Sequence, residues 1–264
     1  MKRSLNIDYK QIRFEVFSEP GQYDPELAEM VKGFPSHNKI ANPASQNLFQ
    51  YLTRYVKTVS ELHFGKPIRD IQILDWGCGM GQITYMLRKN GADPLSCDIK
   101  RQADDSAFGQ PTPIIDRCNI DVIPLEHDYK LPFEDASMDV VLSCGVLEHV
   151  ANDIESLKEI NRILKPSGLF LCFFLPYFLS WTQHFAHMRK DYYHDHLYRV
   201  GQVRNMLRDA NFSLFDIWHR QLFPKNSVRY PNYRWFEKCD QFLVNKTFLK
   251  YFVTNIEFLA VKRG

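Results

Sequence analysis

The sequence predicts an α/β fold built on a doubly wound, mostly parallel sheet, and three observations support this prediction. Short apolar runs alternate with helix-like stretches from residue 71 onward. A glycine-rich turn directly follows the first run, and a helix-compatible stretch follows the turn. The 264 residues are 45% hydrophobic, which is enough to bury a sizeable core under helices on both faces of a sheet.

Seven strands and four helices are expected along the chain. The strands are expected at 71–76, 94–98, 121–125, 138–144, 169–175, 212–219 and 253–262. The helices are expected at 44–62, 80–90, 153–164 and 200–210. The third helix has apolar residues at helical spacing, Asn152 or Asp153 to cap its start, and Pro166 with Gly168 to mark its end.

Three segments fall outside this alternation of strands and helices. Residues 1–68 precede the first strand and are expected to form an N-terminal helical or cap segment, before a main domain at 69–264. Residues 176–199 and 221–250 interrupt the main domain. Ligands bind at the carboxyl edge of open α/β sheets, so these two insertions are expected to form a lid on the acceptor side. The alternative is that they only cover sheet edges.

Charge and composition exclude several classes of protein. The net charge is only +2 and the basic residues are dispersed, which argues against a nucleic-acid partner. Residues 1–6 are charged without an apolar run behind them, unlike a signal peptide. The longest apolar run, 168–181, contains Pro176 and is too short for a transmembrane segment. The cysteines form no Cys-x-x-Cys pair, which favours reduced thiols in a cytoplasmic protein.

The glycine turn predicts a site for a nucleotide cofactor. Residues 74–81 read Leu-Asp-Trp-Gly-Cys-Gly-Met-Gly, and glycines let a ligand approach the backbone while the amides at the helix start point toward it. Asp98 closes the second strand, where a carboxylate accepts hydrogen bonds from ribose hydroxyls. The alternative for Asp98 is a solvated aspartate at a strand end. These features fit nicotinamide and adenosyl cofactors equally well.

Three further motifs carry a resemblance to a known family. Residues 131–141 read Leu-Pro-Phe-x-Asp-x-Ser-x-Asp-Val-Val, 147–150 read Leu-Glu-His-Val, and 164–168 read Leu-Lys-Pro-x-Gly. With the turn and Asp98 before them, they resemble the class I S-adenosylmethionine-dependent methyltransferases, most of all the ubiquinone- and menaquinone-biosynthesis branch. The resemblance covers 70–175 well and 200–219 loosely. It implies a Rossmann-like seven-stranded sheet and S-adenosylmethionine as cofactor.

The resemblance also implies which residues surround the methionine end of the cofactor. Those expected to hold the methionine portion are Asp75, Gly77, Cys78, Gly79 and Gly81. Cys144 and Gly145, at the end of the fourth strand, would lie near the sulfonium through backbone contacts.

The adenosine end of the cofactor is expected to bind four other residues. Asp98 would accept the ribose hydroxyls, and Ile99 would lie against the adenine face. Asp128 would bind the adenine amino group, next to Tyr129, although the spacing of this aspartate before Leu-Pro-Phe varies among relatives.

Catalysis requires alignment of the acceptor and, for a hydroxyl or ammonium, a base that removes a proton. His149 follows the fourth strand and is the first candidate, the alternative being a packing or capping residue at a helix start. His194 lies in a histidine-rich stretch, 184–196, and is the second candidate; that stretch is otherwise a solvated loop or a metal site. Some relatives bind a divalent metal here, but Gly145 stands where their upstream carboxylate would lie. The sequence therefore predicts no metal.

The predicted activity is methyl transfer from S-adenosylmethionine to oxygen, nitrogen or carbon of a small-molecule or lipid-like acceptor. Aromatic residues within 177–198 favour an apolar or ring-bearing acceptor, although they fit a core as well. One alternative is a non-catalytic protein that binds the cofactor and serves as a partner. The other is a nicotinamide-dependent oxidoreductase, whose Gly-x-Gly-x-x-Gly pattern is absent because Gln82 follows Gly81. No oligomeric state is predicted.

Overall fold

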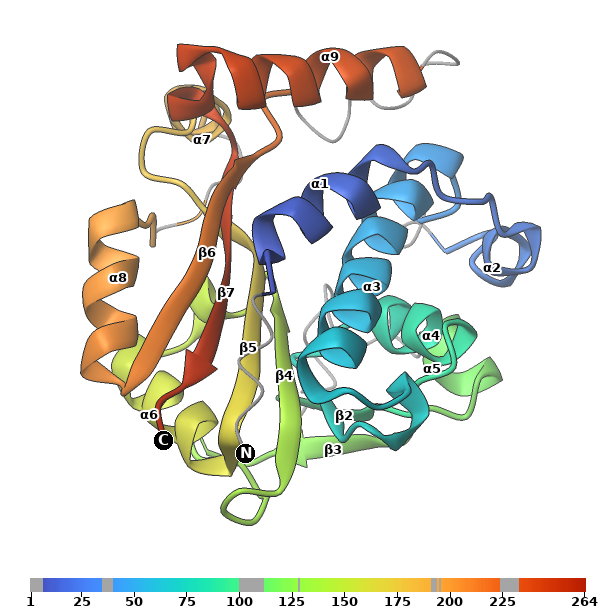
Figure 1. Cartoon of the computed structure of the whole chain (residues 1–264). Helices are drawn as coiled ribbons and strands as arrows, with labels where there is room; N and C mark the ends of the chain where they lie inside the picture. Colours follow the sequence, from blue (N-terminus) through green and yellow to red (C-terminus); the bar gives the residue numbers. More distant parts are fainter. Residues whose placement is uncertain are drawn as a thin grey trace. The chain divides into compact units, whose positions relative to one another are not determined.

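The computed structural model (Figure 1) describes residues 7–34, 40–99, 112–127, 129–190, 194, 196–223 and 233–264. The chain divides into two compact units, and each is described by itself. Unit 1 consists of Met1–Leu125 and Met138–Val141. Unit 2 consists of Glu126–Ser137 and Leu142–Gly264. Asp128 lies outside the described residues.

The strands form one seven-stranded, mostly parallel sheet of the Rossmann-like type, which confirms the predicted fold class. The strands are β1 Ile73–Trp76, β2 Leu95–Ile99, β3 Val122–Leu125, β4 Met138–Cys144, β5 Leu164–Pro176, β6 Phe212–Arg220 and β7 Asn255–Lys262. Their order is β3-β2-β1-β4-β5-β7-β6. β2 pairs in parallel with β1 and β3, whereas β7 runs antiparallel to β5 and β6. All seven predicted strands are present within a few residues of their expected bounds.

The described helices of unit 1 belong to the N-terminal segment, to the turn that follows β1 and to the connection between β2 and β3. These elements are α1 Tyr9–Ser18, α2 Pro25–Met30, α3 Pro43–Phe64, η2 Ile68–Asp70, α4 Gln82–Lys89 and α5 Pro113–Arg117. α3 begins at a cap in which Asn42 Oδ1 accepts from Ser45 N at 2.9 Å, and it ends at Gly65 in the left-handed conformation. Its apolar side packs against α1 and α4.

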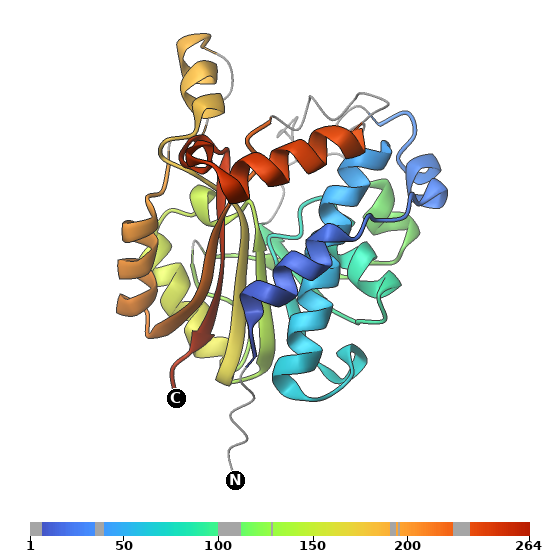
Figure 2. The ribbon, with the colours of Figure 1, turned by 45° about the horizontal axis from the view of Figure 1, so that its top comes forward.

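The described residues of unit 2 contain the end of β4, the strands β5 to β7 and six helical elements. They are η3 Leu147–His149, α6 Asp153–Ile163, α7 Trp181–Met188, α8 Val200–Asp209, α9 Tyr233–Lys246 and η5 Phe248–Phe252 (Figure 2). Residues 169–175 of β5 are buried throughout, as expected of a central strand. α6 packs on β5 and α8 on β6.

The start of β5 differs from the sequence prediction. α6 begins as expected, because Asn152 Oδ1 accepts from Glu155 N at 3.1 Å. The helix ends at Ile163, and extended backbone begins at once at Leu164 rather than at 169. Lys262 Nζ donates to Leu164 O at 2.7 Å, so the end of β7 stabilises this early start.

None of the helices in the described parts of the chain is both long enough and apolar enough to cross a membrane.

Candidate functional site

The glycine turn of unit 1 joins β1 to α4 in a conformation that favours glycine. Gly77, Gly79 and Gly81 have φ angles of 71°, 53° and 81°. The amides of Gly77 and Cys78 donate to Cys97 O on β2 at 2.9 and 3.1 Å. The turn is therefore fixed to the neighbouring strand.

The space beside the turn is open at one glycine and filled at another. A Cβ added to Gly79 would find its nearest heavy atom, Gly77 O, 4.0 Å away. A Cβ added to Gly81 would come within 3.0 Å of Ile115 and Ile120. Gly79 is thus the position at which a ligand has room to approach the backbone, whereas Gly81 is small because side chains pack against it.

Asp75, at the end of β1, is buried directly beneath the turn. It is 1% exposed, and its Oδ2 accepts from Thr84 Oγ1 of α4 at 2.7 Å. Burial, with a smaller contribution from the negative charge of Asp98, raises the pKa of Asp75 to about 6. Its other oxygen, Oδ1, has no hydrogen-bond partner among the described residues. A buried carboxylate oxygen in that state is suited to a donor supplied by a ligand. The sequence did not predict Thr84 as a partner of Asp75. The only signal for it is its position one helical turn after Gly81.

Asp98 lies at the end of β2 and holds the turn from the other side. Its Oδ2 accepts from Gly79 N at 2.6 Å, and its Oδ1 accepts from Ile99 N at 2.8 Å. Ile99 is 66% exposed, an unusual state for a large apolar side chain, and it is therefore accessible to a flat apolar ligand. The contact of Asp98 with ribose stays a prediction, and the structure adds a role in which Asp98 positions Gly79.

The other predicted cofactor residues belong to unit 2. Gly145 follows β4 with a φ of 71°, and its amide donates to Phe173 O at 3.0 Å. Cys144, which precedes it, is partly buried. Tyr129 packs edge-on against His127, with ring centroids 4.5 Å apart. The roles of these residues stay predictions.

Unit 2 brings the two predicted catalytic histidines together. The rings of His149 and His194 lie 5.1 Å apart between centroids. Glu148, which is buried, joins them, and one ligand atom of each of these three residues lies within 4.8 Å of the others. The backbone of His194 is held by Gln183 Oε1, which accepts from His194 N at 3.0 Å. The sequence predicted each histidine separately as a candidate base, but it did not predict that the two rings are in contact.

The surroundings of His149 favour the neutral form of its imidazole. Desolvation, followed by the positive charge of His196, lowers the pKa of His149 from its usual value of 6.5. A neutral imidazole that is half exposed has a free lone pair for a proton at neutral pH. The pair is therefore suited to act as a general base.

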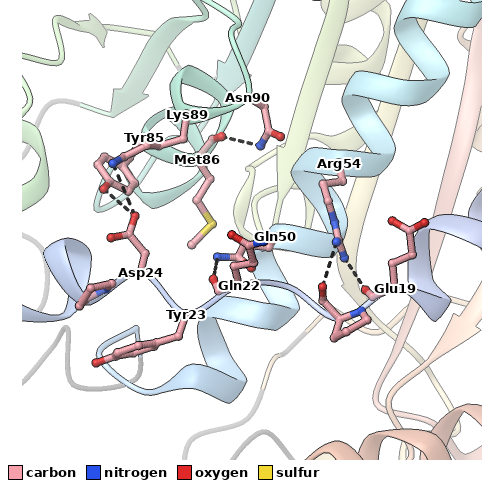
Figure 3. Close-up of a pocket in the computed structure, with 12 residues that line it drawn as sticks. Glu19, Gln22, Tyr23, Asp24, Gln50, Arg54, Tyr85, Met86, Lys89 and Asn90 are labelled. Atoms are coloured by element: carbon pink, nitrogen blue, oxygen red, sulfur yellow. Dashed lines mark hydrogen bonds and ion pairs between the residues drawn. The ribbon is translucent and has the colours of Figure 1, made fainter.

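Unit 1 also contains a polar pocket of about 560 Å³, whose lining includes none of the predicted site residues (Figure 3). Arg54 donates to the carbonyl oxygens of Glu19 and Pro20 at 2.6 and 3.2 Å. Tyr85 Oη donates to Asp24 Oδ2 at 2.8 Å. Figure 3 shows these groups directed at each other, so the pocket walls hold residues 19–25 against α3 and α4. We assign it a structural role.

Asp24→Ala should destabilise unit 1 by about 2 kcal/mol, because Asp24 also caps α2 by accepting from Leu27 N at 3.1 Å. Urea unfolding monitored by circular dichroism measures this loss. Glu26→Ala is the control, since its ion pair with Lys89 is exposed and contributes less than about 0.5 kcal/mol. Equal losses in the two variants would contradict the role assigned to Asp24.

Comparison with known proteins assigns the glycine turn to a family. Residues 74–172 match the family model described as methyltransferase domain. This part of the chain is a methyltransferase domain. The match begins one residue before Asp75 and ends in β5, and it includes Asp98, Gly145 and His149.

Curated relatives of this part of the chain are methyltransferases as well, which confirms the resemblance. The ubiquinone biosynthesis O-methyltransferase of Maricaulis maris is 27% identical over 177 residues, 58% of this chain and 64% of the relative. That of Roseobacter denitrificans is 33% identical over 113 residues, 40% of this chain and 42% of the relative. A sterol 4-C-methyltransferase of Caenorhabditis elegans is 31% identical over 107 residues, 39% of this chain and 31% of the relative. The matches span less than two thirds of each relative's length.

Solved structures support the fold of the methyltransferase domain. A SAM-dependent methyltransferase from Archaeoglobus fulgidus has a TM-score of 0.51 and 16% identity, covering 80% of this chain and 94% of that one. A Galdieria sulphuraria protein, proposed to be a sarcosine dimethylglycine methyltransferase, has a TM-score of 0.56 and 17% identity, covering 97% and 99%. At these identities the likeness concerns the fold alone.

Proposed function

We propose that this chain transfers the methyl group of S-adenosylmethionine to a small-molecule or lipid-like acceptor. The observation that carries this proposal is the glycine turn at the start of the methyltransferase domain, with a buried carboxylate beneath it and open space beside Gly79. The curated relatives support the choice of acceptor class, since their names refer to ubiquinone biosynthesis and to a sterol.

The residues of the turn fit the methionine end of the cofactor. Asp75 Oδ1, buried and without a partner among the described residues, would accept a hydrogen bond from the ammonium group. The open side of Gly79 leaves room for the amino-acid portion. When bound, S-adenosylmethionine supplies a methyl group on a positively charged sulfur. The adenosine would be held by Asp98 and Ile99, each as the sequence predicts.

The histidine pair supports an acceptor that must lose a proton. His149, with its lowered pKa, would accept the proton of an acceptor hydroxyl, which would make that oxygen a better nucleophile toward a methyl donor. His194, whose ring lies beside that of His149, would orient the imidazole or share the proton. We therefore favour O-methylation, and the aromatic residues within 177–198 favour a ring-bearing acceptor.

Calorimetric titration with S-adenosylhomocysteine tests the cofactor assignment. The wild-type protein should bind, and Asp98→Asn should bind roughly tenfold or more weakly, because a charged acceptor of hydrogen bonds is lost. Asp93→Asn is the matched control, since Asp93 has an 89% exposed side chain in the same unit. Absence of binding, or binding of NADH in its place, would contradict the proposal and favour an oxidoreductase.

A screen with radiolabelled S-adenosylmethionine tests the transfer itself. Phenols, quinone precursors, sterols and lipid head groups are offered as acceptors, and labelled product is measured. Cofactor binding without transfer to any acceptor class would favour the non-catalytic partner protein.

Metal-assisted methylation is a second candidate function, favoured by the spacing of Glu148, His149 and His194. Two imidazoles and a carboxylate within 4.8 Å of one another are ligands typical of zinc and other transition metals. A cation held there would bind the acceptor oxygen and lower its pKa. The metal-free prediction from the sequence stays a prediction.

Chelation separates the two candidates. If the histidines act as a base, dialysis against EDTA should leave turnover within about twofold of the untreated enzyme, since a general base needs no cation. Loss of activity that one equivalent of a divalent cation restores, with metal content abolished in His194→Ala, would instead show a metal centre.

A further inference from the structure

Three helical elements of unit 2 lie at one edge of its strands. β5 ends and β7 begins at the pair Pro176–Asn255, and β6 ends at the pair Arg220–Asn255. α7 follows β5, while α9 and η5 lie between β6 and β7. α7, α9 and η5 therefore extend from the same edge, as Figures 1 and 2 show.

Hydrogen bonds fix α7 and α9 to a common segment. Trp181 Nε1 of α7 donates to Leu222 O at 2.7 Å, and Leu222 N donates to Asp240 Oδ1 of α9 at 2.8 Å. Thr182 and Thr254 hydroxyls lie 3.2 Å apart and connect α7 to the residue before β7. Because η5 also contacts α9, the three elements form a connected part of unit 2.

Large apolar side chains are exposed on these elements to an unusual degree. The exposed fractions are 63% for Trp235, 62% for Phe242, 70% for Phe248 and 73% for Met188. Exposed clusters of such residues mark interaction sites in proteins. Trp235 and Phe242 are seven residues apart on α9 and so lie on the same face of the helix, opposite the buried Val244.

Positive charges accompany these apolar side chains. Lys238 and Lys246 share the outer face of α9 with Trp235 and Phe242 by helical spacing, and both are exposed. The basic residues of the three elements and of the two positions after α7 are Arg189, Lys190, Arg234, Lys238, Lys246 and Lys250. The acidic ones are Glu237 and Asp240, and Asp240 faces inward to the amides of Leu222 and Phe223.

We propose that this surface, which we call the α9 face (α9, η5 and the exposed side of α7), docks on membranes that contain anionic phospholipids. Trp and Phe side chains beside Lys and Arg on one face of a helix are typical of helices that lie in the interfacial plane. The aromatic rings would enter the head-group region, and the lysines would lie against lipid phosphates. A second copy of the chain fits this face less well, because face-to-face contact would bring like charges together.

Vesicle co-sedimentation of the full chain tests the proposal. We expect binding to vesicles of phosphatidylcholine with phosphatidylglycerol, weaker binding to phosphatidylcholine alone, and loss of the difference at high salt. The Trp235→Ser/Phe242→Ser variant and the Lys238→Glu/Lys246→Glu variant should each partition roughly tenfold less. Leu62→Ser and Arg69→Glu, at exposed positions of unit 1, are the matched controls and should bind as wild type.

Three outcomes would overturn the proposal. The first is absence of binding to either vesicle, and the second is binding that both α9 variants retain. The third is a concentration-dependent dimer that the aromatic variant disrupts without any vesicle binding, which would assign the face to a second copy. Thermal melting and S-adenosylhomocysteine titration of each variant confirm that its fold is intact, so a failure here is distinguishable from a failure of the methyltransferase assignment.

Discussion

Gly79→Arg abolishes binding of S-adenosylhomocysteine, with an expected loss of at least about 100-fold in affinity, or roughly 2.7 kcal/mol. The reason is steric. A Cβ at residue 79 points into open space, with Gly77 O at 4.0 Å as the nearest heavy atom, so the variant side chain would occupy the volume offered to the ligand. The φ of 53° adds strain for any residue other than glycine. Isothermal titration calorimetry measures the loss.

Gly201→Arg is the matched control for this substitution. Gly201 also has open space around a Cβ, but it lies on the exposed start of α8 and has no positive φ. Its variant should fold and bind as wild type. Unchanged affinity in Gly79→Arg, with thermal melting that shows an intact fold, would mean that the ligand does not approach the turn.

His149→Ala should lower turnover by about 10²- to 10⁴-fold, the usual contribution of a general base, while the affinity for S-adenosylhomocysteine changes little. His149 is half exposed, so its removal leaves no large cavity. The pH profile of kcat/KM gives a second readout. Because the pKa of His149 is lowered, the acid limb of wild-type activity should lie at a lower pH than an unperturbed imidazole would give, and this limb should disappear in the variant.

His187→Ala serves as the control for His149→Ala, since His187 is an exposed histidine of α7 outside the pair. Its turnover of a water-soluble acceptor should match that of the wild type. If His149→Ala lowered turnover and cofactor affinity by the same factor, His149 would be a structural residue and the base would have to be sought elsewhere.

Local patterns of the chain predicted most of the fold. The seven strands lie close to their expected positions because each is a short apolar run bounded by polar or glycine-rich turns. The helix at 44–62 extends to 43–64, since Asn42 and Gly65 supply its caps. The start of β5 was misplaced because Pro166 and Gly168 indicate a break in the chain but not that the backbone before them is already extended.

The candidate site was predictable only in part, for a physical reason. The turn at 77–81 and Asp98 are adjacent to strand ends, and parallel strands place such residues at one edge. The partners of these residues depend on side-chain packing, which no local pattern encodes. Neither the bond from Gly79 N to Asp98 nor the contact of Thr84 with Asp75 could be read from spacing.

The sequence by itself determined the part of this protein that is expected to bind the methyl donor. A glycine-rich turn, an aspartate at the end of each of two strands and three ordered motifs are local features, and the match over residues 74–172 confirms the methyltransferase domain that they predict. The tertiary structure alone decided which residues of unit 2 act together. His149 and His194 are far apart in the chain, and they meet because His194, whose amide is held by Gln183 of α7, lies with its ring against that of His149 in η3. The exposed side of α9 could not be predicted from the sequence either, because helical periodicity shows which residues share a face but not which face is buried.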